Sequence, residues 1–236
     1  MTLRGVRQAL EDELASQDPE PHGVLRVTAS VSFGQLHLAP AVADYVKRYK
    51  QARIELLMVD RIVNLVEERI DLAVRISRQI DPALIARRLA DCRSVLCAAP
   101  AYLQQAGLPA HPQDLEQAPH RVVGYLRSRS GTVLPYTLQR GDEQVTVRGR
   151  QLLAVDDGNA YLAAGVAGLG ALWLPDYMAA PHLAAGELVR LFPGWHIDAM
   201  PLYLAFPPNR HVSAKLRVFI DWVARLVAQH MPPTRP

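Results

Sequence analysis

Apolar and polar positions alternate from Leu25 to Ala29, and this alternation predicts a β-strand. The next apolar side chains follow the spacing of one helix face, which predicts an amphipathic helix with Pro40 in its first turn. They are Leu38, Val42, Tyr45, Val46 and Tyr49. A nearly continuous apolar run at 53–59 is typical of a strand buried on both faces.

The pattern then predicts a short helix at 64–70 and a strand at 71–76. Strands and helices therefore alternate along this part of the chain. Such an order favours a parallel sheet with helical crossovers.

Strands and helices also alternate in the remainder of the chain. Further strands are predicted at 94–98, 122–125, 137–138, 144–147, 151–155, 171–174 and 201–206. Further helices are predicted at 101–106, 158–167, 175–184 and, from the clearest apolar stripe, 212–227.

This pattern fits two α/β lobes better than one. Residues 24–98 form the first predicted lobe, which 201–236 complete by returning to it, and 99–200 form the second. A chain that crosses twice between lobes makes a hinge, with a cleft facing the carboxyl ends of the strands. Residues 1–23 are expected to hold a short helix followed by a hinge rich in proline and glycine.

Composition narrows the class of protein. Half of the 236 residues are apolar, and no apolar run is long enough for a membrane span. Residues 1–17 carry acids and no signal-like apolar stretch, so we expect a cytoplasmic protein. Cys92 and Cys97 could pair, but the reduced form is favoured. The net charge of +3 is too small to demand a nucleic-acid surface.

No catalytic motif is present. The sequence lacks a G-x-S-x-G elbow, an H-E-x-x-H pair, a phosphate-binding loop and a C-x-x-C motif, and its histidines are scattered. The glycines of "GVAGLG" at 165–170 follow a predicted helix, whereas a dinucleotide fingerprint follows a strand. We therefore predict no enzyme, no metal and no cofactor.

Small polar side chains gather where predicted strands end. Ser30, Ser32 and Phe33 follow the first strand, and either serine can cap the next helix while the other faces a ligand. Asp157 follows a later strand, where helix capping is favoured over acid–base chemistry. The loop Leu126–Gly131 combines two arginines with two serines and could hold a carboxylate or be an exposed turn.

Several blocks, in order, resemble the effector-binding domain of LysR-type transcriptional regulators. They include "GVLRVTASVSFGQLHLAP", "DRIVNLVEERIDLAVR", "RRLADCRSVLCAAPAYL", "GLGALWLPDYMAAPHLAAGELVRLFPGW" and "PLYLAFPPNRHVSAKLRVFIDWV". The resemblance covers about residues 24 to 228. It implies two Rossmann-like lobes similar to type 2 periplasmic binding proteins, a small effector in the interlobe cleft, and a homo-oligomer.

The resemblance also implies, by position, a set of effector-binding side chains. These are Ser30, Ser32, Phe33, Arg61, Ile62, Arg127, Ser128, Arg129, Ser130 and Asp157. The basic character of Arg127 and Arg129 favours an organic acid as effector. Dimer contacts are expected on the helix with Leu38, Val42 and Tyr45 and on the short helix with Asn64 and Leu65.

One departure from the family changes the expected partners. The winged helix-turn-helix that precedes this domain in LysR-type regulators is absent, and residues 1–16 resemble the tail of its linker helix. We therefore expect a dimer, a tetramer when full length, and DNA binding only through the missing domain. A solute-binding protein for transport is the alternative function, which the absent signal peptide disfavours.

Overall fold

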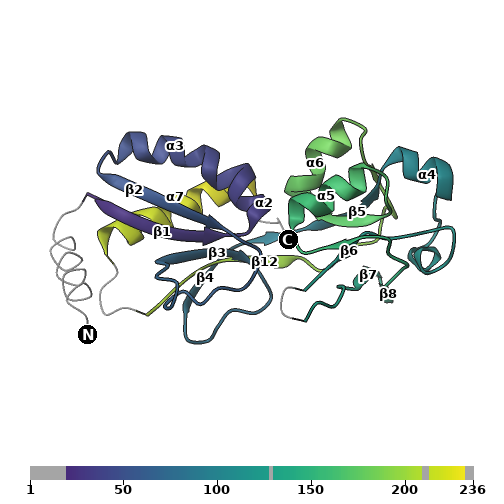
Figure 1. Ribbon diagram of the computed structural model, residues 1–236, viewed down its shortest axis with the longest axis horizontal. Helices are drawn as coiled ribbons and strands as arrows, with labels where there is room; N and C mark the ends of the chain where they lie inside the picture. Colours follow the sequence, from purple (N-terminus) through teal and green to yellow (C-terminus); the bar gives the residue numbers. More distant parts are fainter. Residues whose placement is uncertain (1–19, 128–129, 209–212, 232–236) are drawn as a thin grey trace. The chain divides into compact units, whose positions relative to one another are not determined.

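The protein folds into two compact units, each of which contains both helices and strands (Figure 1). The computed structural model describes residues 20–127, 130–208 and 213–231. The first unit contains the chain up to Val59, Val63–Ala90 and the part from Pro201, and the second contains Asp60–Ile62 and Asp91–Met200. The predicted α/β class is confirmed. The linker helix expected at residues 1–16 lies outside the described residues.

A five-stranded sheet forms the centre of the first unit. Its order is β2 (Ala52–Met58), β1 (Gly23–Ala29), β3 (Leu72–Ile76), β12 (Met200–Phe206) and β4 (Ile85–Cys92). Strand β1 runs parallel to β2 and β3, whereas β12 runs antiparallel to β3. The sheet is thus mixed, because the last strand enters it from a distant part of the chain.

The first helix begins earlier than its apolar stripe predicted. Helical backbone starts with α2 (Val31–Phe33) and passes through a π-helical turn, η1 (Gly34–Leu38), into α3 (Ala39–Arg48). The Ala39 N–H donates to the Gly34 carbonyl, the wider spacing of a π turn. Pro40, which has no N–H to donate, is therefore accommodated inside a longer helical run rather than in its first turn.

The prediction of a short helix at 64–70 is wrong. This segment forms a turn in which the Asn64 side chain accepts the N–H groups of Val66, at 3.1 Å, and Glu67, at 3.2 Å. These are the contacts of an N-cap, and the Glu68 N–H also donates to the Asn64 carbonyl at 3.0 Å, so a helical turn begins here. Arg69 then adopts a φ of 53°, which ends the turn.

Three small sheets make up the second unit. The first has the order β10 (Leu172–Pro175), β5 (Ser94–Ala98) and β11 (Val189–Arg190). The others pair β6 (Gly124–Tyr125) with β9 (Ala154–Val155), and β7 (Tyr136–Arg140) with β8 (Glu143–Val147). Because β5 pairs with β10 and β11, the chain passes from the first unit to the second at Asp91, before 94–98 rather than after it.

Four helical segments accompany these sheets: α4 (Pro100–Ala106), the 3-10 turn η2 (Pro112–Glu116), α5 (Gly158–Val166) and α6 (Asp176–Ala184). Strands β4 and β11 and the turn η2 were not predicted. Helix α5 packs closely on β10 at Gly165, where an added Cβ would lie 2.3 Å from Leu172 Cδ1. This contact explains the first glycine of "GVAGLG" without a nucleotide.

Helix α7 (Ala214–His230) packs its apolar stripe into the first unit. The ring of its Phe219 meets the ring of Tyr45 edge-on, with centroids 5.1 Å apart. Leu38 and Tyr45 are 0% and 1% exposed, so they cannot supply the dimer surface expected of them. Cys92 and Cys97 are buried free thiols, as favoured, and burial raises the pKa of each to about 12.

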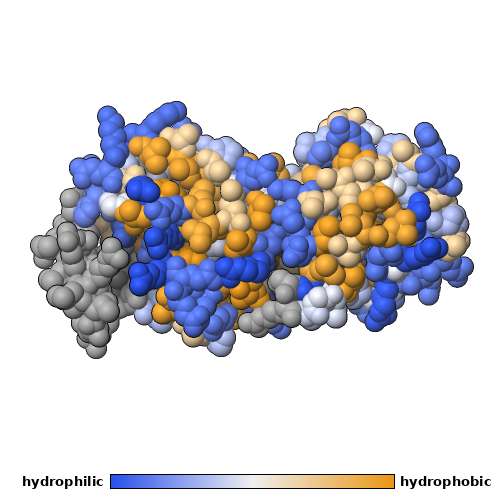
Figure 2. Space-filling model, viewed as in Figure 1, coloured by the Kyte–Doolittle hydropathy of each residue, from blue (hydrophilic) through white to orange (hydrophobic). Residues whose placement is uncertain are grey.

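Apolar side chains nevertheless reach the surface, where Figure 2 shows them between hydrophilic areas on each unit. Leu36, Ile62 and Val66 are 44%, 66% and 69% exposed. Within the described ranges, no helix has the length and apolarity to cross a membrane.

Candidate functional site

Ser30 lies where β1 ends and α2 begins, at the N-cap position. Its carbonyl accepts the Gly34 N–H at 2.8 Å, but its side chain makes no capping hydrogen bond. Among the described residues, its Oγ is shielded from solvent and has no hydrogen-bond partner. The cap that the sequence allowed at Ser30 is therefore not made, and its hydroxyl keeps its full hydrogen-bonding capacity.

The end of β1, which precedes Ser30, is held by a network of polar side chains. Thr28 is fully buried, and its Oγ1 donates to the Leu57 carbonyl at 2.9 Å. Arg75 Nη2 donates to the same Oγ1 at 2.9 Å, and Arg75 Nη1 donates to the Val59 carbonyl. The ends of β1, β2 and β3 are thereby tied together. Ser32 and Phe33 point into the core, with 6% and 1% exposed.

A pair of histidines lies one turn beyond this strand end. The ring centroid of His37, in η1, lies 5.1 Å from that of Phe33 and 4.9 Å from that of His230 in α7. Burial, and then the charge of His230, lower the pKa of His37 below its usual 6.5. Both causes disfavour the charged imidazolium in the folded protein.

We expect this histidine to make the first unit less stable in mild acid. A His whose pKa is lower in the folded state contributes stability above pH 6.5, the unfolded value, and loses it as the pH falls toward the folded value. Urea unfolding at pH 7.5 and pH 5.5 should show this loss, and His37→Gln should reduce it. An equal pH dependence in the variant would contradict the assignment, and His22→Gln is the matched control.

In the second unit, the segment Asp60–Ile62 lies against the start of α5. Asp60 Oδ2 accepts the Gly158 N–H at 3.3 Å, over a separation of 98 residues. The Tyr125 hydroxyl at the end of β6 donates to the Asp156 carbonyl at 3.3 Å. Burial, and then the carboxylate of Asp60, raise the pKa of Tyr125 above its usual range. The predicted residues Arg61, Ile62 and Asp157 therefore share one region.

Asp157 is the N-cap of α5, as the sequence favoured. Its Oδ1 accepts the Ala160 N–H at 2.8 Å. We expect Asp157→Ala to cost about 0.5–2 kcal/mol of unfolding free energy, because an orphan N–H of the first turn loses its partner. Asp157→Asn, which keeps the acceptor, is the matched control. Chemical denaturation of the two variants measures the difference, and equal stabilities would show that the cap is unimportant.

The described residues on either side of the loop expected to carry the basic effector contacts pair with one another in antiparallel fashion. The Arg127 N–H donates to the Thr132 carbonyl, and the Gly131 N–H donates to the Arg127 carbonyl, both at 2.9 Å. Ser130 Oγ lies 2.7 Å from Thr132 Oγ1. The Leu126 N–H donates to Val155 at 2.8 Å, so this loop leaves β6 beside β9. Ser128 and Arg129 lie outside the described residues.

The structure thus brings Arg61, Ile62, Arg127 and Asp157 to the carboxyl ends of the parallel strands β6 and β9. Ser30, Ser32 and Phe33 lie at the carboxyl end of β1 in the other unit. The sequence did not single out Asp60 or Tyr125, although an acid and an aromatic residue at predicted strand ends were a usable signal. No group of three metal-ligating side chains occurs in the described part of the chain.

Comparisons with known proteins show the family of the chain. Residues 18–228 match the family described as LysR substrate binding domain. The sequence is 32% identical over 221 residues to an HTH-type transcriptional repressor of Pseudomonas aeruginosa, covering 94% of this chain and 69% of that protein. It is 35% identical over 202 residues to the regulator PtxR of the same species, covering 86% of this chain and 64% of PtxR.

A solved structure is similar as well. The regulatory domain of CrgA, a LysR-type transcriptional regulator from Neisseria meningitidis, superposes with a TM-score of 0.76 at 26% identity. That match covers 89% of this chain and 100% of the CrgA domain. The chain thus spans about two thirds of the length of the two regulators and matches the CrgA regulatory domain over its whole length.

Proposed function

The chain belongs to the LysR substrate binding domain family, and from this we propose that it is the ligand-sensing regulatory domain of a LysR-type transcriptional regulator. The relatives are named as a transcriptional repressor and a transcriptional regulator. The solved neighbour is named as a regulatory domain. A transport protein of the same fold, the alternative from the sequence, is not favoured because these relatives regulate transcription.

The observation that supports a specific class of ligand for this domain is the hydroxyl of Ser30, which has no hydrogen-bond partner among the described residues. A shielded hydroxyl with no partner costs about 1–3 kcal/mol relative to a satisfied one. The hydroxyl stands beside the first N–H groups of a helical run, which attract negative charge. A bound carboxylate would give the Ser30 hydroxyl an acceptor. We therefore propose a small organic acid as the effector and Ser30 as one of its contacts.

The residues of the second unit that we also propose as effector contacts are Arg61, Ile62, Arg127, Ser128, Arg129, Ser130 and Asp157. Ser32 and Phe33, the other residues expected in the first unit, are 6% and 1% exposed, so their side chains are not proposed as contacts. Arg127 is exposed, and a guanidinium can bind a carboxylate through two parallel hydrogen bonds. Asp157 already caps α5 through one oxygen, so its proposed contact uses the other.

The remaining features of the proposal concern the whole regulator. We propose that the chain has no catalytic role, assembles as a homo-oligomer through exposed apolar side chains, and acts in the cytoplasm. Its relatives carry an HTH element by name. DNA binding is therefore assigned to a helix-turn-helix domain and not to this one.

The test is thermal unfolding against a panel of small metabolites weighted toward carboxylic acids. A ligand present at 100 times its Kd stabilises the folded state by about 2.7 kcal/mol, which raises Tm by several degrees. We expect at least one carboxylate to do so, and Arg127→Gln to reduce the shift. Stabilisation only by uncharged compounds, with no effect of Arg127→Gln, would overturn the organic-acid assignment.

A further inference from the structure

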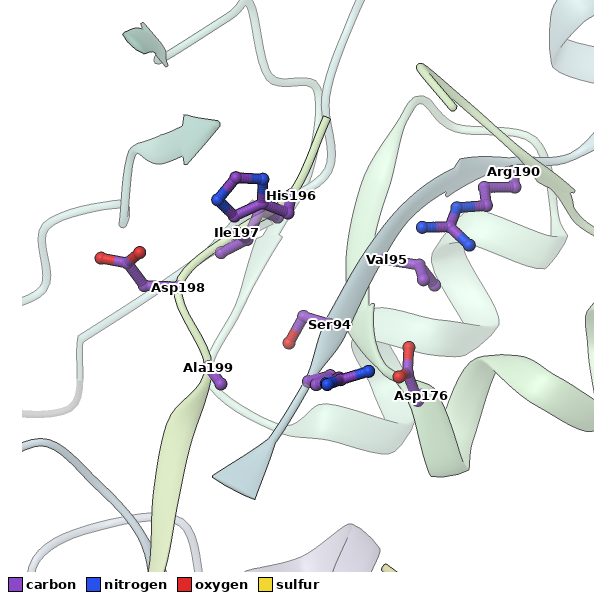
Figure 3. Close-up of a pocket in the computed structure, with 9 residues that line it drawn as sticks. Ser94, Val95, Asp176, Arg190, His196, Ile197, Asp198 and Ala199 are labelled. Atoms are coloured by element: carbon purple, nitrogen blue, oxygen red, sulfur yellow. The ribbon is translucent and has the colours of Figure 1, made fainter. Parts of the chain in front are cut away.

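The second unit contains a pocket of about 440 Å³ to which none of the predicted effector-binding residues contributes (Figure 3). Its walls come from the start of β5, the first residue of α6, the end of β11 and the segment 196–199. The volume lies in the range of about 300–1,000 Å³ that is typical of small-molecule sites. Val95, Ile197 and Ala199 supply its apolar lining.

The pocket forms because the pairing of β11 with β5 stops before it reaches the first residues of β5. Arg190 pairs with Cys97, and the Leu191 N–H donates to the Leu96 carbonyl at 2.8 Å. Phe192 then adopts a φ of 50° and Gly194 a φ of 94°, and this backbone cannot continue the strand. The first residues of β5 are therefore left without a strand neighbour on that side.

An unused backbone donor and acceptor face this gap. In an antiparallel ladder, the N–H and C=O groups of successive residues point to opposite sides. The Leu96 carbonyl points to the β11 side, and the Arg93 carbonyl accepts the Asp176 N–H on the β10 side, at 2.9 Å. Ser94 therefore directs its N–H and C=O toward the missing neighbour, and no described residue hydrogen-bonds to them there.

The opposite wall is held in place by β7. The Gln139 N–H donates to the His196 carbonyl at 2.8 Å, and the His196 N–H donates to the Gln139 carbonyl at 2.9 Å. Arg190 and Asp176 lie on one side of the pocket, and His196 and Asp198 lie on the other (Figure 3). The gap is thus bounded by two backbone segments that are each anchored to a strand.

The charges of the lining balance. Arg93 and Arg190 supply two positive charges, and Asp176 and Asp198 supply two negative ones. Both guanidinium groups lie close enough to Asp176 to lower its pKa, although burial outweighs them and raises this pKa above its usual value. The side with Arg93, Arg190 and Asp176 carries a net positive charge, and the side with Asp198 carries a negative one.

We propose that this pocket is a second binding site, for a small zwitterion of the amino-acid or dipeptide class. The carboxylate of the ligand binds Arg190 and Arg93, and its ammonium group binds Asp198. Its amide or main-chain polar groups bind the N–H and C=O of Ser94, as a strand residue would. A simple anion fits less well, because the two aspartates cancel the positive charge that would attract it.

The test is calorimetric titration of the chain with L-alanyl-L-alanine and with two capped forms. N-acetylation removes the ammonium group, and C-terminal amidation removes the carboxylate. We expect the free dipeptide to bind and each capped form to bind at least about tenfold more weakly, since each lacks one charged hydrogen-bonding group. Equal binding of the acetylated form would overturn the zwitterion assignment, and no heat at millimolar dipeptide would overturn the site.

Variants locate the binding and separate it from the effector site. Arg190→Gln and Asp198→Asn should each weaken dipeptide binding about tenfold, whereas Arg225→Gln on α7 should leave it unchanged. Ser30→Ala should also leave it unchanged. Dipeptide binding that is lost in Ser30→Ala and kept in Arg190→Gln would place the ligand in the effector site and overturn this inference alone. Circular dichroism checks that each variant is folded.

Discussion

Phe219→Ala is expected to destabilise the first unit by about 3–5 kcal/mol, the usual cost of removing a buried phenylalanine side chain. The Phe219 side chain is 0% exposed. Its ring centroid lies 5.1 Å from those of both Tyr45 and Trp222. The substitution therefore removes burial and aromatic contacts together, and it leaves a cavity between α7 and α3.

Hydrogen exchange of the amides in β1 and β3 measures this loss in the unit that contains Phe219. Arg225→Ala changes an exposed residue of the same helix and should remain within about 0.5 kcal/mol of the parent protein. A loss below about 1 kcal/mol for Phe219→Ala would contradict the packing of α7 against α3.

The second large effect is expected from Tyr161→Phe in the second unit. The Tyr161 hydroxyl lies 2.6 Å from that of Tyr136 and accepts the Trp173 N–H at 3.3 Å. Tyr136 in turn donates to the Val123 carbonyl. Removing one oxygen thus leaves a buried N–H and a buried hydroxyl with fewer partners. We expect a cost of about 1–3 kcal/mol.

A double-mutant cycle with Tyr136→Phe tests whether the two hydroxyls act together. Because they bond to each other, the cost of the double variant should fall short of the sum of the single costs. Tyr203→Phe is the control, since its hydroxyl has no hydrogen bond within the described ranges. Additive costs in urea unfolding would show that the Tyr136–Tyr161 bond contributes nothing to stability.

The parts of the fold that the sequence predicts are those with a strong local pattern. Strand β1 shows alternation, β2 carries a nearly continuous apolar run, and α7 repeats its apolar side chains at helical spacing. The expectation that β2 is buried on both faces is wrong, because β2 lies at the edge of the sheet and none of its residues is buried. Strand β4 was missed because the start of "IARRLADC" is exposed and carries no buried face. The expected helix at 64–70 stops after one turn, because Arg69 adopts a φ of 53°, a conformation that a right-handed helix does not continue.

For the candidate site, too, the sequence predicts local features and misses those that depend on the three-dimensional structure. Sequence pattern places Ser30 and Asp157 at strand ends, and it favours the cap that Asp157 makes. It cannot show that the Ser30 hydroxyl remains without a partner, because that depends on the backbone around it. Nor can it bring Asp60 to Gly158, since that contact joins segments from distant parts of the chain.

The central claim is that this domain senses a small acid through Ser30, and one titration tests it most directly. The strongest carboxylate from the unfolding panel is titrated calorimetrically into the parent chain, Ser30→Ala and the control Arg225→Gln. We expect about tenfold weaker binding for Ser30→Ala, from the loss of one hydrogen bond to a charged group, and unchanged binding for Arg225→Gln. Equal affinity of all three proteins would contradict the account.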